Sequence, residues 1–126
     1  MAQEIRAGDV VWRDLTVGDA EKIGSFYEAV VGWQRSVHPG CDDFNLTPAG
    51  GDEPVAGVCF AKGSNADLPP QWLVWVAVDD VAAAAARVRE HGGKILDGPR
   101  MMGNHSCCVL EDPAGAVLGL IATTPG

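Results

Sequence analysis

The sequence is poor in basic side chains and has no long apolar run. Nine Lys and Arg against seventeen Asp and Glu give a formal net charge of −8. Nucleic acids and anionic membrane surfaces bind a concentrated basic face, whereas the basic residues here are scattered along the chain. No segment offers the ~20 apolar residues of a membrane-spanning helix, and the N-terminal stretch lacks the apolar core of a secretory signal. We therefore expect neither nucleic acid nor a membrane as a partner.

Cysteine is scarce, and several familiar motifs are missing. The four cysteines do not have the spacing of a disulfide framework. Cys107 and Cys108 are adjacent, so on a strand their side chains point to opposite faces. The chain has no Gly-x-Ser-x-Gly elbow, no phosphate loop and no dinucleotide fingerprint. These features predict a reduced, cytoplasmic protein that uses none of those three kinds of site.

What the sequence does contain is one pattern repeated at half-chain spacing. The stretch WRDLTVGDAEKIGSFYEAVVGW begins at Trp12, and its outline returns 61 residues later, at Leu73, as LVWVAVDDVAAAAARVREHGGK. Each copy reads as a strand followed by an amphipathic helix. The helix is capped by Asp19 in the first copy and by Asp79 or Asp80 in the second, and each helix ends at a glycine. The repeat predicts a duplicated module.

Short strands complete each module, so the chain is predicted to be one α+β domain of two βαβββ modules over residues 1–126. The halves cover about 9–61 and 72–122, joined by a polar, proline-containing linker at 62–71. Strands are expected at 9–16, 33–37, 43–47, 55–61, 72–78, 94–96, 105–110 and 117–121. The first helix is expected to bury Ala20, Ile23, Phe26, Tyr27, Val30 and Val31. The stretch GPRMMGN is expected to be a loop, with Met101 and Met102 either in a mobile lid or in an ordinary turn.

The repeated stretches, together with EDPAGAVLGLI near the C-terminus, resemble the vicinal oxygen chelate superfamily. This group includes glyoxalase I, the bleomycin-resistance proteins and the extradiol dioxygenases. The resemblance covers nearly the whole chain. It implies that the two modules curve into an open half-barrel with a cleft for a small ligand, and that the protein is a homodimer. In metal-dependent members, the opening and closing strands of each half supply His, Glu or Gln ligands.

At the positions where the resemblance implies metal ligands, this sequence departs from the pattern. They fall on Trp12 and Leu73 in the opening strands and on Gly57 and Gly119 in the closing strands. None of these side chains has the oxygen, nitrogen or sulfur donors that divalent ions require. We therefore expect no metal cofactor. The disfavoured alternative is a rearranged site built from His38 and Cys41 with Cys59 and either Cys107 or His105.

Five residues are candidates for contact with a ligand. Trp12, Trp72 and Trp75 lie on strands near the expected cleft, where indoles bind apolar or planar molecules; alternatively they fill the core or a dimer interface. Asp14 is two residues after Trp12 and so lies on the same face of a regular strand. Free imidazole has a pKa near neutrality, so His105 could act as a general base or ligand contact, or else be an exposed histidine at the edge of a loop.

The sequence favours a cytoplasmic, homodimeric protein of the bleomycin-resistance kind, which binds a small organic ligand in a metal-free cleft lined by tryptophan. An acidic protein would suit a cationic ligand. The alternative is a glyoxalase-like isomerase or lyase, either metal-independent with His105 or Asp14 as the catalytic group, or with a rearranged metal site. A third hypothesis is a regulatory or structural subunit whose cleft is closed by Trp12.

Overall fold

The computed structural model describes residues 4–38 and 43–126, which form two compact units. The first-half unit is Trp12–Trp72, and the second-half unit contains Leu73–Gly126 together with the residues up to Val11. The segment before Trp12 joins the second-half unit because Gly8 N donates to Ala77 O at 2.8 Å. In the described residues, no helix is long and apolar enough to span a membrane.

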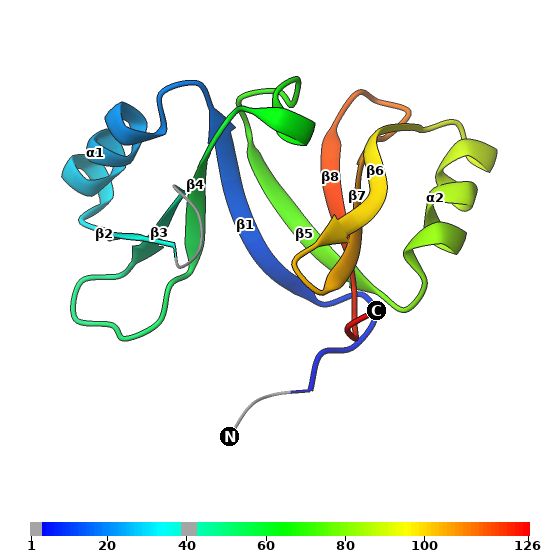
Figure 1. The fold of residues 1–126 in the computed structure, drawn as a ribbon, viewed down its shortest axis with the longest axis horizontal. Helices are drawn as coiled ribbons and strands as arrows, with labels where there is room; N and C mark the ends of the chain where they lie inside the picture. Colours follow the sequence, from blue (N-terminus) through cyan, green and yellow to red (C-terminus); the bar gives the residue numbers. More distant parts are fainter. Residues whose placement is uncertain (1–3, 39–42) are drawn as a thin grey trace. The chain divides into compact units, whose positions relative to one another are not determined.

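The first-half unit has a mixed sheet with one helix packed on it (Figure 1). Its elements are β1 (Val10–Val17), α1 (Ala20–Val31), β2 (Gln34–Val37), β3 (Phe44–Thr47), β4 (Ala56–Phe60) and a 3-10 turn (Gly63–Asn65). The strand order is β2-β3-β4-β1, in which β1 and β4 are parallel and the other neighbours are antiparallel. This is the predicted βαβββ module.

The second-half unit repeats this arrangement. Its elements are β5 (Trp72–Val78), α2 (Val81–Glu90), β6 (Lys94–Met102), β7 (His105–Glu111) and β8 (Val117–Ala122). The strand order is β5-β8-β7-β6, again with one parallel pair, β5 and β8, and antiparallel neighbours elsewhere. The predicted α+β fold of two βαβββ modules is confirmed.

The predicted helix boundaries follow from local hydrogen bonding. Asp19 accepts a hydrogen bond from Lys22 N at 3.0 Å, and Asp80 accepts one from Ala83 N at 3.0 Å. Each carboxylate satisfies an amide that has no partner within the first turn. Gly32 has a φ of 85° after α1, a left-handed conformation that favours glycine.

The predicted buried face of α1 is only partly correct. Phe26, Val30 and Val31 are 54%, 64% and 52% exposed. Ala20 is buried as predicted, and the other buried residue of α1 is Gly24, which the prediction did not include. A glycine carries no hydrophobic signal, so the periodicity pointed to the wrong stripe, whereas the absence of a side chain is what lets the helix approach the sheet.

Gly24 makes room for a side chain from β2. A methyl group on Gly24 would lie 2.9 Å from Arg35 Cδ. Arg35 crosses this space, donates from Nη1 to Glu21 O at 2.7 Å, and stacks 4.7 Å from the centre of the Phe44 ring. The first-half core therefore includes an arginine that ties α1 to the sheet.

The prediction that residues 98–104 form a loop is wrong for residues 98–102, and only Gly103 and Asn104 form a turn. β6 continues to Met102 and pairs with β7 after register shifts between Ile95 and Asp97 and between Asp97 and Arg100. The Gly98-Pro99 sequence reads as a turn. Here Gly98 has a φ of 89° and lies where the strand is irregular, so the glycine accommodates a bulge within the strand.

Candidate functional site

Each sheet has one face covered by its own helix and one helix-free face. In the first-half unit, Ala56 and Val58 belong to the core that includes α1. Because side chains alternate along a strand, Gly57 lies on the helix-free face. It pairs with Asp14 on β1 and with Asn45 on β3. The carboxylate and the amide therefore flank a position that has no side chain.

Trp12 borders the same position. A methyl group on Gly57 would lie 3.5 Å from Trp12 Cζ2 and 3.5 Å from Asp14 Cβ, which are ordinary van der Waals separations. Trp12, Asp14 and Asn45 are only partly buried. We call the group formed by Trp12, Asp14, Asn45, Gly57 and Cys59 the Gly57 face.

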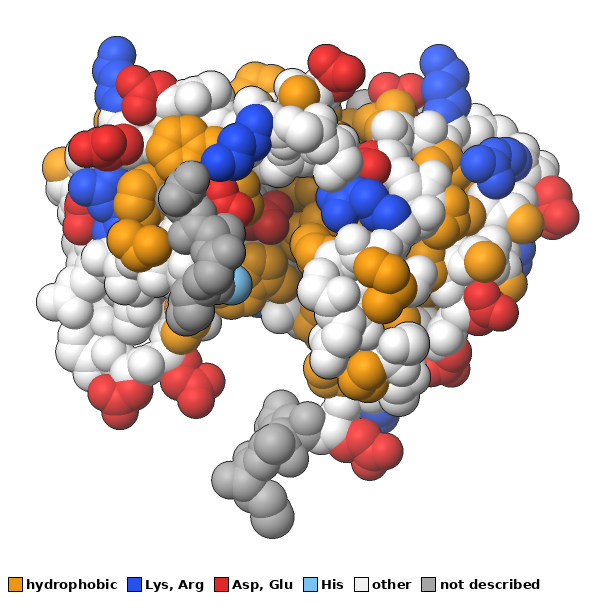
Figure 2. Space-filling model, viewed as in Figure 1, with side chains coloured by type: hydrophobic (Ala, Val, Ile, Leu, Met, Phe, Trp, Pro, Cys, Tyr) orange, Lys and Arg blue, Asp and Glu red, His pale blue; other side chains and the backbone are white. Residues whose placement is uncertain are grey.

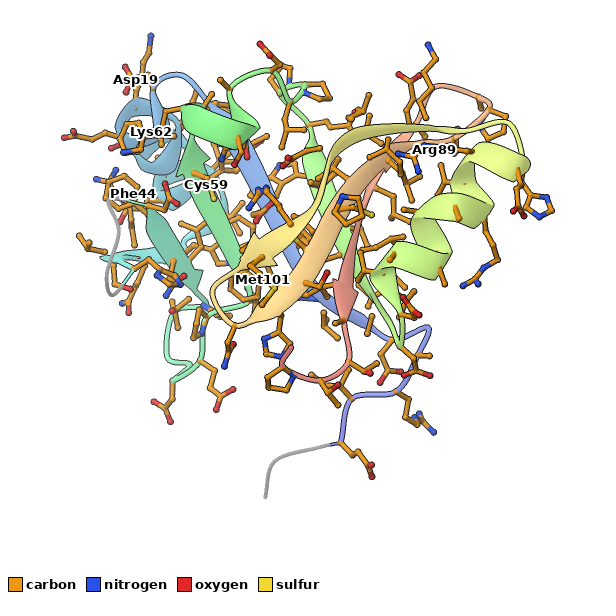
Figure 3. The ribbon with its side chains drawn as sticks, turned by 45° about the vertical axis from the view of Figure 1, so that its right-hand side comes forward. Asp19, Phe44, Cys59, Lys62, Arg89 and Met101 are labelled. Atoms are coloured by element: carbon orange, nitrogen blue, oxygen red, sulfur yellow. The ribbon has the colours of Figure 1, made fainter. Side chains whose placement is uncertain are left out.

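Cys59 adds a thiol to the Gly57 face. It lies two residues beyond Gly57 on β4 (Figure 3), and its Sγ is 4.0 Å from Asp14 Oδ2. Thr16 pairs with Cys59 and is 7% exposed. The Gly57 face therefore has an indole, a carboxylate, an amide and a thiol, all partly buried, around Gly57, which is itself buried.

The corresponding place in the second-half unit is filled. Trp75 pairs with Gly119, as Asp14 pairs with Gly57. A methyl group on Gly119 would overlap the Trp75 ring, with Cζ3 at 2.8 Å. Trp75 is 4% exposed, and Cys107 and Val109 on the same face are 1% exposed. The indole thus packs directly on the glycine and leaves no room there.

Beyond Trp75, the helix-free face of the second-half unit carries an ion pair. Arg100 donates from Nε to both carboxylate oxygens of Asp97, at 2.9 and 3.1 Å, and its Nη2 lies 2.9 Å from Oδ2. The hydrogen bond to Asp97 holds the pKa of Arg100 above its usual value. Arg100 pairs across the strands with Cys107, whose thiol pKa is raised by burial.

The two remaining predicted site residues lie away from Gly57. Trp72 Nε1 donates to the Tyr27 hydroxyl at 3.1 Å, and its ring lies 5.9 Å from that of Trp33. These rings pack with the core that includes α1. His105 begins β7, partly buried, with Nδ1 2.9 Å from Asn104 Oδ1.

The structure therefore brings two of the five predicted residues, Trp12 and Asp14, together on one face. Trp72 belongs to the same unit but lies in its aromatic core. Trp75 and His105 belong to the second-half unit. Sequence reasoning missed Asn45, although the alternation of Phe44, Asn45 and Leu46 would have indicated which face it occupies.

The family's metal positions offer no donor set. Trp12, Leu73, Gly57 and Gly119 have no atoms that coordinate a divalent ion. Among residues 4–38 and 43–126, no group of three or more His, Cys, Asp and Glu side chains is placed to hold a metal ion. Cys41, one member of the hypothetical rearranged site, lies outside the described residues.

Basic side chains are dispersed over the surface. On the face shown in Figure 2, the described Lys and Arg side chains are separated by acidic, polar and apolar ones. This distribution agrees with the scattered basic residues of the sequence.

Residues 9–120 match the family model described as Glyoxalase/Bleomycin resistance protein/Dioxygenase superfamily. The chain belongs to this superfamily, as its sequence pattern predicted.

Relatives and solved structures agree with this assignment. One relative is the putative glyoxylase CFP32 of Mycobacterium tuberculosis. It is 29% identical over 121 residues, which cover 93% of this chain and 46% of CFP32. The anthracycline biosynthesis protein DnrV of Streptomyces peucetius is 28% identical over 128 residues, covering 90% of this chain and 46% of DnrV. This chain thus spans about half the length of these curated relatives.

Two solved structures share the fold. A superfamily member from Vibrio splendidus 12B01 has a TM-score of 0.56 at 16% identity, covering 88% of this chain and 96% of that one. Methylmalonyl-CoA epimerase from Mycobacterium tuberculosis has a TM-score of 0.54 at 15% identity, covering 99% and 94%. At these identities the likeness extends to the fold alone.

Proposed function

We propose that this protein binds a small planar organic molecule on the Gly57 face without a metal ion, in the manner of a bleomycin-resistance protein. One observation carries the proposal: the Trp12 indole beside the buried Gly57 is only partly buried, whereas Gly119 is covered by the buried Trp75. A ligand ring can lie against the exposed part of the Trp12 indole.

The physical basis is the burial of aromatic area. An indole contributes a large apolar surface, and aromatic pairs add about 0.5–1.5 kcal/mol beyond area burial. The name of DnrV refers to anthracyclines, a class of compounds with fused planar rings, so an anthracycline belongs in the first panel of ligands. We also propose that the protein is cytoplasmic and homodimeric. Light scattering on the purified protein tests the oligomeric state.

The test is titration calorimetry with planar aromatic ligands, including an anthracycline, in the presence of EDTA. We expect Trp12→Ala to weaken binding by about tenfold or more, with no difference when EDTA is omitted. The matched control is Phe26→Ala, because Phe26 is an aromatic residue of the same unit that lies 54% exposed on α1. Binding that requires a divalent ion, or that is indifferent to Trp12→Ala, would overturn the proposal.

A second candidate function is supported by the name of CFP32, which proposes a glyoxylase. In this chain, Asp14 on the Gly57 face is the group best placed for proton transfer to or from a bound carbonyl compound. An isomerase assay with a thiol adduct of a 2-oxoaldehyde, with and without added divalent metal, tests it. Turnover abolished by Asp14→Asn would favour the enzyme over the binding protein.

A further inference from the structure

The charged residues of the first-half sheet are sorted between its two faces. Strands β1 to β4 contain three of them: Arg13, Asp14 and Arg35. Arg13 alternates away from Asp14 and donates from Nη1 to Val55 O at 3.0 Å. Arg35 pairs with Leu46, a core residue on the helix side, and its Nε lies 3.4 Å from Glu28 Oε1. Among these strand residues, the helix-free face therefore carries a negative charge and no positive one.

The negative charge lies directly across from the glycine floor. Asp14 and Asn45 flank Gly57 on the two neighbouring strands. A carboxylate offers about four acceptor sites and an amide oxygen two more. The thiol of Cys59, 4.0 Å from Asp14 Oδ2, is only a weak donor. The Asn45 amide also carries two N–H donors, so acceptor sites outnumber donors on this face without excluding them.

From this arrangement we infer the chemical class of the ligand: a planar aromatic molecule that carries a protonated amine, with the ring against Trp12 and the ammonium group directed at Asp14 and Asn45. The inference rests on the proposed binding at the Gly57 face and adds which ligands that face prefers. A charge-assisted hydrogen bond in a partly buried site favours the ammonium over a neutral isostere by about tenfold or more.

The second-half unit provides an internal contrast. The position that pairs with the glycine is Asp14 in one half and the apolar Trp75 in the other. A carboxylate at this position would be costly in a closed core, and it is found instead on the half where the side chains around the glycine are only partly buried. Asp14 is therefore a charged group of this sheet that stays partly exposed to solvent.

The test compares two probes that differ only in the polar group: naphthylmethylamine and naphthylmethyl methyl ether. We expect the wild-type protein to bind the amine about tenfold more tightly than the ether. Asp14→Asn, which keeps the shape and removes the charge, should bring the two dissociation constants within about twofold of each other. The matched control is Glu53→Gln, which removes an exposed carboxylate of the same unit and should leave the preference intact.

A second variant works in the opposite direction. Asn45→Asp adds a carboxylate across Gly57, so the preference for the amine should increase severalfold. Equal binding of amine and ether by the wild-type protein, or an unchanged preference in both Asp14→Asn and Asn45→Asp, overturns the inference. If either result is found but the ether still binds and Trp12→Ala weakens its binding, the inference fails and the proposed function is retained. If neither probe binds the wild-type protein, both the inference and the proposed function are contradicted.

Discussion

The two halves of this chain share a scaffold but differ at the glycine of the closing strand. In the second half, Trp75 lies on Gly119 and is 4% exposed. In the first half, the residue that pairs with the glycine is Asp14, and the nearby Trp12 leaves ordinary van der Waals separations around Gly57. A duplicated module can therefore fill one copy of a position with a buried indole and place a partly buried carboxylate at the other.

The two halves are expected to differ most in the stability that is lost when Trp75 or Trp12 is removed. Trp75→Ala should lower the free energy of unfolding by about 3–5 kcal/mol, because it deletes a buried aromatic side chain and leaves a cavity. Trp12→Ala, at a partly buried position, should cost about 1 kcal/mol or less. Urea denaturation of both variants measures this. Equal losses would mean that Trp12 fills a core as Trp75 does, which is the closed-cleft hypothesis.

Substitution of Gly119 or Gly57 should also destabilise the second half more than the first, with a smaller change in the free energy of unfolding. Gly119→Ala would force a methyl group into the Trp75 ring, and overpacking of this kind typically costs about 1–3 kcal/mol. Gly57→Ala meets its neighbours at 3.5 Å and should change stability by less than about 0.5 kcal/mol. The midpoints of thermal or urea unfolding distinguish the two variants. A destabilising Gly57→Ala would show that the space beside Gly57 is already occupied.

Where the scaffold is shared, the halves should respond alike. Asp19→Ala and Asp80→Ala each remove an N-cap hydrogen bond of 3.0 Å, so each should cost about 1 kcal/mol. Asp19→Asn and Asp80→Asn are the matched controls, because asparagine caps helices about as well. A large difference between the two alanine variants would show that the helices do not serve equivalent roles.

The smallest expected effect is on the pH dependence of stability. Burial raises the pKa of Cys108 in the second half from its usual 9.0 to about 11. Between these values the unfolded chain loses a proton that the folded protein keeps, so folded-state stability falls with rising pH. The contribution of the Cys108 thiol to the free energy of unfolding is therefore complete below pH 9.0 and is lost as the pH rises toward about 11. Denaturation across this range should show a decline that Cys108→Ala reduces. A decline of the same size in Cys108→Ala would exclude this thiol as its source.

Much of the fold could be predicted from the sequence because its signals are local. The N-cap aspartates and the glycine after α1 each specify a boundary through nearby atoms. The buried stripe of α1 and the length of β6 could not be predicted. Gly24 is buried by the approach of Arg35, and β6 continues through a bulge at Gly98 against β7. Both depend on residues distant in sequence.

The candidate site was predictable to a similar extent. Alternation along β1 correctly put Trp12 and Asp14 on one face, and the repeat identified Gly57 as an equivalent of Gly119. The sequence could not show that one glycine is covered by an indole and the other is not, because that depends on side-chain packing between strands. It also offered no way to separate Trp72, which donates to Tyr27 in the core, from the other tryptophans.

The most direct test of the central claim is the affinity of Gly57→Val for naphthylmethylamine, measured by titration calorimetry beside the wild-type protein. A valine suits a strand, and its branched side chain would occupy the space beside Trp12 and Asp14. With the fold verified by near-UV circular dichroism, we predict that the dissociation constant rises by about tenfold or more. A folded Gly57→Val protein that binds this amine as tightly as the wild type would contradict the account.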